Sequence, residues 1–171
     1  MSNSVLGTGF KYGLYTRSPG GEWVQDGEPE FNLIPQVGVD HIASLIRGAG
    51  ATPISSWYMG LFESNYVPTS GVEAAALPGV VGESGAYDEA TRPAWTHQYD
   101  GVSVIDNTAS LATFTMNASK RIYGAFIISS STKQGNSGLI LSIARFSTPR
   151  DLEPGQQFGV GAVLTLIPTS F

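Results

Sequence analysis

The sequence contains no cysteine, and only 13% of its 171 residues are charged. The absence of cysteine excludes disulfide bonds, thiolate metal ligands and a cysteine nucleophile. The charged fraction is about half of the usual ~25%, so Ser, Thr, Gly, Asn and small apolar groups must cover much of the surface. Such a surface suits lasting contact with other protein, although β-rich chains with many Gly and Thr are also low in charge.

Basic clusters and long apolar runs are missing as well. The net charge is −5, and the nine Lys and Arg residues are scattered, with Lys120-Arg121 as the nearest approach to a cluster. Because nucleic-acid binding requires grouped basic residues, we expect no nucleic-acid partner. No apolar run approaches the ~18–20 residues that span a bilayer, and no signal peptide is visible at the N-terminus, so we expect no membrane partner either.

Side chains suited to catalysis are few. The chain has two histidines, and no set of three or four ligands has the short spacing of a zinc site. His97, with Asp88, Glu89 and Asp100, is the one loose collection of ionisable groups, and we interpret it as a solvated polar loop. No G-x-S-x-G elbow or phosphate-binding glycine loop is present. We therefore expect no catalytic residue, no metal ligand and no cofactor.

The length predicts one domain, and the amino-acid composition changes near residue 31. Residues 1–31 are rich in Gly, Pro and polar groups, with a strong turn signal at 18–22. Two short aromatic pieces, 10–15 and 22–25, lie around that turn. We expect an extended N-terminal arm or edge hairpin here, followed by a single β-rich domain over 32–171.

One helix is predicted, from Pro35 to Arg47. Asn32 is a possible cap upstream, and Gly48 and Gly50 are stop signals. The apolar residues recur at i, i+3, i+4 and i+7, which is typical of a helix with one apolar face: Val39, Ile42, Ala43 and Ile46.

Strands account for most of the rest. In the segment 57–62 both faces are apolar, which predicts a strand buried on two sides. The segment 63–99 has almost no periodicity, and a loop of this length is usually functional or partly structured. After Gly101 several short strands alternate with turn signals, including a hairpin tip at 135–138. The pattern predicts a mainly β fold, an antiparallel β-sandwich or barrel (jelly-roll-like) with one short α-helix.

Aromatic residues in the N-terminal segment and the long loop are the candidates for partner contact. They could anchor protein contacts, stack on sugars, or form a minor core beneath the loop. The residues are Tyr12, Tyr15, Trp23, Tyr66, Tyr87 and Trp95.

The order of these motifs resembles a group of small structural proteins of tailed bacteriophages, over about residues 31–168. The likeness begins with the helix that ends at Arg47-Gly48, and continues through 57–62 and Asn65-Tyr-Val-Pro-Thr69. The later matching motifs are Tyr87, Arg92-Pro-Ala-Trp95, Asn107, Phe114, Tyr123-Gly-Ala-Phe126, Gly138–Ser147 and Gly155-Gln-Gln-Phe158.

The resemblance implies a non-enzymatic virion component, assembled in the host cytoplasm, of the capsid decoration or cement type. Its partners would be the major capsid protein and copies of itself, in a dimer or trimer. On this hypothesis residues 1–31 and the loop 63–99 carry the contacts. The alternative is a tail-fibre, baseplate or host-surface module that binds carbohydrate through Tyr66, Tyr87 and Trp95. A hydrolase is a third class, and it would need residues such as His97 to converge with an acid.

Overall fold

The computed structural model describes residues 9–166, and its larger sheet pairs the first strand with the last. β1 (Phe10–Arg17) is antiparallel to β10 (Gln157–Thr165) along its whole length, with Phe10 opposite Leu164. Short strands extend this pair on both sides, and β5 lies beyond β6. Beside β1 lie β2 (Val24–Gln25) and β3 (Glu30–Phe31), and beside β10 lie β6 (Val104–Asp106) and β7 (Ala112–Thr115), with β5 at Gln98–Tyr99.

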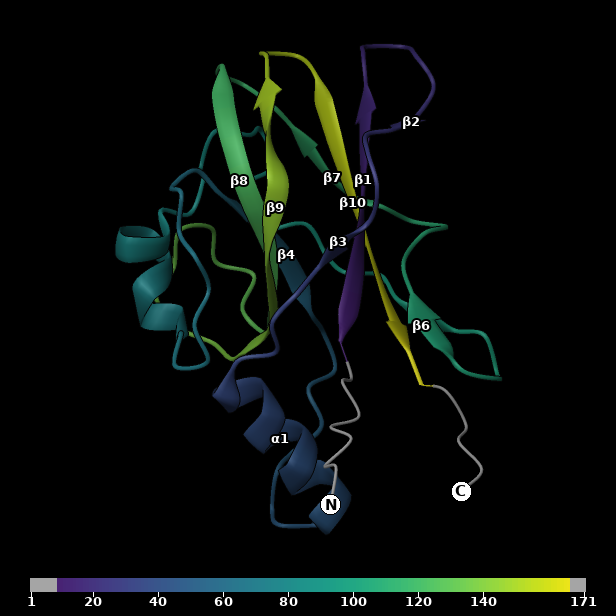
Figure 1. Ribbon diagram of the computed structural model, residues 1–171, viewed down its shortest axis with the longest axis vertical. Helices are drawn as coiled ribbons and strands as arrows, with labels where there is room; N and C mark the ends of the chain where they lie inside the picture. Colours follow the sequence, from purple (N-terminus) through teal and green to yellow (C-terminus); the bar gives the residue numbers. More distant parts are fainter. Residues whose placement is uncertain (1–8, 167–171) are drawn as a thin grey trace, which may run out of the picture.

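The second sheet is smaller and also antiparallel. β8 (Lys120–Ile128) lies in its centre, between β4 (Tyr58–Phe62) and β9 (Ile140–Leu152). The two sheets form the layers of a β-sandwich, with α1 beyond one end (Figure 1). The mainly β, antiparallel sandwich with a short helix that the sequence predicts is therefore confirmed.

The N-terminal segment belongs to the sandwich from Phe10 onward. Phe10, Tyr12 and Leu14 alternate toward the interior and are at most 1% exposed, as expected for a strand with one buried face. They join the core cluster that fills the space between the sheets. β1 pairs with β2, at the edge of the sheet, across the turn at 18–22, and it lies inside the sheet between β10 and the short strands β2 and β3. Residues 1–8 lie outside the described residues.

The smaller sheet is buried on both faces. Met59, Leu61 and Phe62 of β4 are fully buried, which confirms the prediction for the segment 57–62. The outer face is covered by the helical turns η1 (Ala74–Ala76) and η2 (Leu77–Val81), which lie beside this sheet in Figure 1. A second apolar cluster forms there, of Phe62, Val72, Ala74, Leu77, Val81, Phe126, Ile128, Ile140 and Ile143.

Two glycines let aromatic rings cross the β4–β8 pair. Gly60 is paired with Phe126, and Phe62 with Gly124. A β-carbon at Gly60 would lie 2.2 Å from the ring of Phe126, and one at Gly124 would lie 2.1 Å from the ring of Phe62 and 2.2 Å from the carbonyl oxygen of Ala144. Each ring therefore occupies the place of the side chain that its partner lacks.

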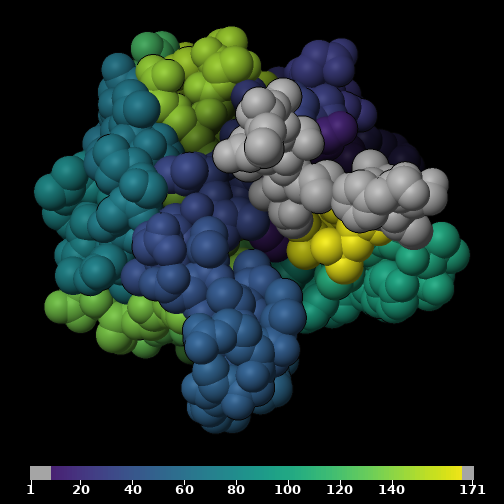
Figure 2. Space-filling view, turned by 60° about the horizontal axis from the view of Figure 1, so that its bottom comes forward, coloured from purple at the N-terminus to yellow at the C-terminus, as the bar shows by residue number. Residues whose placement is uncertain are grey.

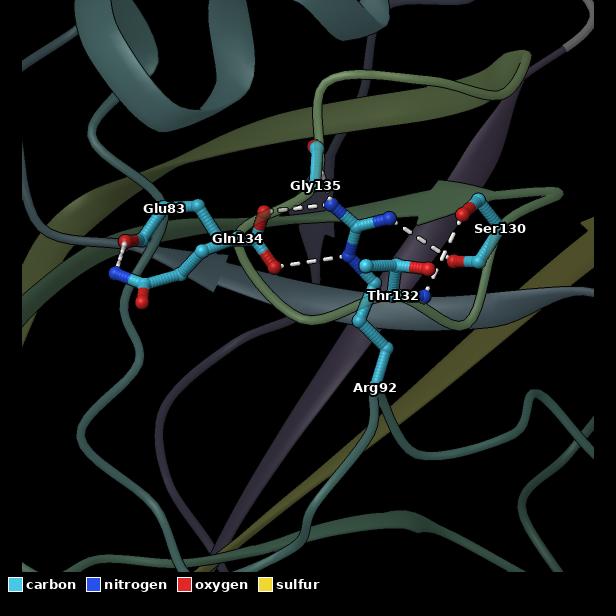
Figure 3. A network of polar contacts seen from close by, with 6 residues as sticks. All are labelled: Glu83, Arg92, Ser130, Thr132, Gln134 and Gly135. Carbon is cyan, nitrogen blue, oxygen red and sulfur yellow. Dashed lines mark hydrogen bonds and ion pairs between the residues drawn. The ribbon is translucent and has the colours of Figure 1, made fainter.

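A buried ion pair fixes the long segment after β4. The Arg92 guanidinium donates two hydrogen bonds to the Glu83 carboxylate, at 2.8 and 2.6 Å, and both side chains are fully buried. It also donates to the carbonyl oxygens of Ser130 and Gly135, at 2.9 and 3.0 Å, in the loop between β8 and β9 (Figure 3). The ring of Phe126 lies 5.4 Å away. The segment 63–99 is thus held to the sandwich as a packed layer.

The helix α1 (Gln36–Arg47) matches its predicted range almost to the residue. Pro35 occupies the N-cap position without a side-chain cap, and Gly48 ends the helix in the left-handed conformation (φ 63°), as is common for glycine at a C-terminus. Asn32 does not cap the helix as expected. Its side-chain oxygen accepts a hydrogen bond from the backbone N–H of Phe10, at 2.7 Å, and so ties the approach to α1 onto β1.

Candidate interaction groove at the α1 end of the sandwich

An apolar groove of about 410 Å³ opens between α1 and the end of the sandwich. Its volume lies within the ~300–1,000 Å³ range of ligand pockets. Two histidines are the polar side chains among otherwise apolar walls. The lining residues are Phe10, Ile34, His41, Ile42, Leu45, Ile46, Pro53, Ile54, Trp57, Trp95, His97, Ile105, Leu141, Leu164 and Leu166. We call this the end groove.

Trp95 is fixed in the wall of the end groove. Its indole N–H donates to the Asn107 side-chain oxygen, at 3.1 Å, and to the carbonyl oxygen of Ala162, at 3.3 Å. Asn107 is itself held by β10, because its oxygen accepts from the Ala162 N–H at 2.7 Å and its amide donates to Val160 at 3.2 Å. Phe10 meets Trp95 edge to face, with ring centroids 5.6 Å apart. The wall is therefore preorganised.

Both histidines of the chain lie in the end groove against tryptophans. His97 stacks on Trp95, with centroids 4.3 Å apart and planes 10° apart. His41, on α1, meets Trp57 edge to face at 6.2 Å. The Nε2 atom of His41 is buried and has no hydrogen-bond partner among the described residues. A buried polar atom of this kind is costly unless some group bonds to it.

Part of the apolar surface of α1 is uncovered. Gly38 is the one residue of the helix that is buried, whereas Ile46 is 81% exposed and Val39 44% exposed. Figure 2 looks onto this end, and the segment 36–53 forms a lobe that projects from the sandwich. An uncovered stripe on an amphipathic helix is typical of a contact surface. We call the exposed apolar part of α1 (Val39, Leu45 and Ile46) the α1 ridge, and two of its residues, Leu45 and Ile46, also line the end groove.

Three of the six aromatic candidates for partner contact are interior residues. Tyr12 and Tyr87 are at most 1% exposed and Trp95 is 4% exposed. Burial raises the pKa of the Tyr12 phenol, whose hydroxyl donates to Ser142 at 2.7 Å, and burial likewise raises that of Tyr87. A partner could not reach the rings of Tyr12 and Tyr87 in the folded subunit. Trp95 alone of the six lines the end groove.

The other three aromatic candidates are partly exposed, and the structure does not bring them together with the end groove. Trp23 stacks on the Arg17 guanidinium, at 4.3 Å, beside β1. Tyr15 is half-buried in β1 itself. Tyr66 packs against the second apolar cluster, on the outer side of the smaller sheet. Their role in partner contact stays a prediction.

The ionisable residues of the long loop do not converge. Asp100 accepts hydrogen bonds from the backbone N–H groups of the three residues at 102–104, and the Glu89 carboxylate accepts from the Thr115 N–H in β7. The Nδ1 atom of His97 is 3.1 Å from the Trp95 carbonyl oxygen. Over residues 9–166, no hydrogen bond or ion pair joins His97 to Asp88, Glu89 or Asp100, and no group of acidic or histidine side chains could hold a metal ion.

A second depression, of about 580 Å³, is polar and wide open. Its charged groups already have partners, since Glu63 pairs with Lys120 at 2.7 Å and Glu83 pairs with Arg92. Gln134 and four other small or polar residues complete the lining. The end groove is the stronger candidate for a binding site, because its walls are apolar and the Nε2 atom of His41 has no hydrogen-bond partner among the described residues.

Sequence reasoning predicted the apolar residues of α1 but missed the groove. One signal in the sequence could have indicated the groove: both histidines and two of the tryptophans lie in or beside apolar segments. No helix within residues 9–166 has the length and hydropathy needed to cross a membrane. Comparisons with protein-family models, with curated proteins and with solved structures found no match to this chain.

Proposed function

We propose that this chain is a structural protein of a phage virion, of the capsid decoration or cement type, which binds the assembled head and stabilises it. The observation that carries the proposal is the exposed α1 ridge at one end of the sandwich. The sandwich itself is held by one apolar cluster between its sheets and a second on the outer face of the smaller sheet. An exposed apolar ridge on a rigid body suits lasting attachment to a protein surface. The resemblance to small virion proteins names the partner as the major capsid protein.

The low charge of the chain supports the same proposal. A surface with few charges allows many copies to lie close together without strong mutual repulsion. Attachment of many copies to a repeated surface then gains from avidity, even where each contact is weak. We propose that copies also contact one another as a dimer or trimer on the head.

The carbohydrate-binding alternative has less support. It used Tyr66, Tyr87 and Trp95 as a stacking platform, and a sugar needs exposed ring faces. Tyr87 and Trp95 are at most 4% exposed, and the stacked face of Trp95 is occupied by His97. We therefore do not propose it as the function.

The test uses virions that lack this chain. We expect such particles to lose integrity at lower temperature and under milder osmotic shock, and purified protein to restore their resistance. Restoration should fail for Ile46→Asp in the α1 ridge and succeed for Val80→Asp, a matched control on η2 with 70% exposure. Unchanged resistance of the depleted particles would contradict the proposal. A copy number of only a handful per virion would place the chain in the tail instead.

A further inference from the structure

The end groove has a buried floor and an exposed mouth. Phe10, Trp57 and Trp95 form part of the floor and are at most 8% exposed, whereas Leu45 and Ile46 of α1 are 38% and 81% exposed. The groove therefore opens to solvent beside α1 and is closed on the side of the sandwich. A closed apolar floor below an open mouth is the usual shape of a site for a small molecule.

One buried polar atom interrupts the apolar walls. The Nε2 atom of His41 has no hydrogen-bond partner among the described residues, and a buried group in this state is costly. A bound water molecule is a poor remedy, because it needs about two to four polar partners and the side chains around the groove are almost wholly apolar. A ligand that joins one hydrogen-bonding group to an apolar body meets both requirements of the site.

A hydroxyl group fits this nitrogen in either form of the neutral imidazole. Nε2 donates in one tautomer and accepts in the other, and a hydroxyl group can accept or donate in turn. A carboxylate can only accept, and its charge would be costly to bury against apolar walls. The rings of Phe10, Trp57 and Trp95 in the floor favour an aromatic ligand, because aromatic pairs gain from edge-to-face contact.

We propose that the end groove binds a small phenol with an apolar substituent, whose hydroxyl group forms a hydrogen bond with Nε2 of His41. In this arrangement the ring contacts the aromatic floor, and the substituent contacts the aliphatic side chains of the walls. The volume of about 410 Å³ suits one molecule of this size. The proposal concerns the isolated subunit, and it does not rest on the proposed function because it needs no capsid.

The probe is 4-propylphenol, titrated into the full chain and followed by calorimetry, with propylbenzene as the matched ligand that lacks the hydroxyl group. We expect saturable binding of 4-propylphenol, together with a shift of the His41 imidazole resonances in NMR spectra. The variant His41→Phe keeps a ring at this position. It should weaken binding of 4-propylphenol about five- to tenfold, the usual worth of one hydrogen bond, and should leave the affinity for propylbenzene unchanged.

A second pair of variants tests the location of the ligand without changing the histidine. Leu45→Trp enlarges an exposed side chain at the mouth of the groove, and it should weaken binding of both ligands severalfold. Val80→Trp is the matched control on η2, where the side chain is 70% exposed, and it should leave both affinities unchanged. Equal binding by the two variants would place the ligand outside the end groove and would contradict the proposal.

Three further results would overturn the proposal. One is the absence of saturable binding of 4-propylphenol to the unmodified chain. Another is an equal loss of both ligands in His41→Phe, which would show that the hydroxyl group does not use Nε2. The third is tighter binding of N-acetyl-tyrosine amide than of 4-propylphenol, which would assign the groove to a tyrosine side chain of a protein partner. None of these measurements involves virions, so failure of this proposal is distinguishable from failure of the proposed function.

Discussion

The ring of Phe126 lies against the backbone of Gly60 in the neighbouring strand, where a β-carbon would be 2.2 Å from the ring. Phe126 is fully buried in the second apolar cluster, to which Leu77 and Val81 of η2 also belong. We expect Gly60→Ala to lower the free energy of unfolding by about 1–3 kcal/mol, the usual cost of overpacking. Urea unfolding followed by circular dichroism measures it. Gly71→Ala is the matched control, since no atom lies within 4 Å of its β-carbon position, and an equal loss there would contradict the explanation.

The Arg92–Glu83 pair predicts a strongly non-additive result. Arg92→Met leaves the Glu83 carboxylate buried without its partner, and breaking such a pair costs about 3–5 kcal/mol. Replacing both residues by Met should restore a large part of the loss, because no unpaired charge remains. A double-mutant cycle from urea unfolding provides the coupling energy. Simple additivity of the two single losses would show that the pair is not coupled as described.

Asn107 should contribute more to the free energy of unfolding than its small side chain suggests. Asn107→Ala leaves the buried Ala162 N–H without its acceptor, and it leaves the Trp95 indole N–H with only the longer bond, 3.3 Å, to the Ala162 carbonyl oxygen. Each buried group left unsatisfied costs about 1–3 kcal/mol. We expect a loss in that range in urea unfolding, together with a changed tryptophan emission of the native state. Asn136→Ala, at an exposed position of the β8–β9 loop, is the control and should change neither quantity.

The α1 ridge should contribute to contact rather than to stability. Ile46 is 81% exposed, so Ile46→Glu should change the free energy of unfolding by no more than about 0.5 kcal/mol. The same substitution should lower binding of the purified protein to heads that lack it, measured by co-sedimentation. Val80→Glu, with similar exposure on η2, should leave that binding unchanged. Equal effects of the two variants would mean that general surface hydrophobicity, and not this ridge, is responsible.

Asp100 predicts a pH dependence of known sign. Backbone hydrogen bonds, the one from Val104 first, hold the pKa of its carboxyl below the usual value. Stabilisation by the carboxylate is therefore complete above the ordinary pKa of about 3.9 and is lost as the pH falls through the lower pKa of the folded state. Asp100→Ala should lower the melting temperature at pH 7, and the difference from the wild type should vanish toward pH 2. A difference that persists at low pH would assign the effect to something other than the charge.

Local pattern predicted much of this fold. The two apolar faces of the segment 57–62 indicated a strand buried on both sides. Pro35 and Gly48 indicated the two ends of the helix. Both signals are local, since they depend on side chains a few positions apart. The pattern could not show which segment packs against the helix, because an apolar stripe indicates only that burial of that face would be favourable. Val39 and Ile46 therefore fit the predicted stripe and yet lie exposed.

The features that sequence analysis missed depend on pairing between strands that are far apart in the sequence. The turn-rich surroundings of Phe10, Tyr12 and Leu14 suggested an edge, while their true neighbours are in β10, at the other end of the sequence. Burial of Tyr87 and Trp95 likewise depends on β7 and β10 and on a buried asparagine. No periodicity near these aromatics distinguishes an interior ring from a surface one.

The pairing of β1 with β10 has a consequence for biosynthesis. During translation, β1 emerges before the other described strands, and it cannot pair with β10 until all the described strands between them have emerged. The larger sheet can therefore be completed only once β10 is available, with a large loop-closure penalty and a high contact order, which slow folding. A circular permutant that joins the ends of β1 and β10 through a short linker should refold faster than the natural chain order.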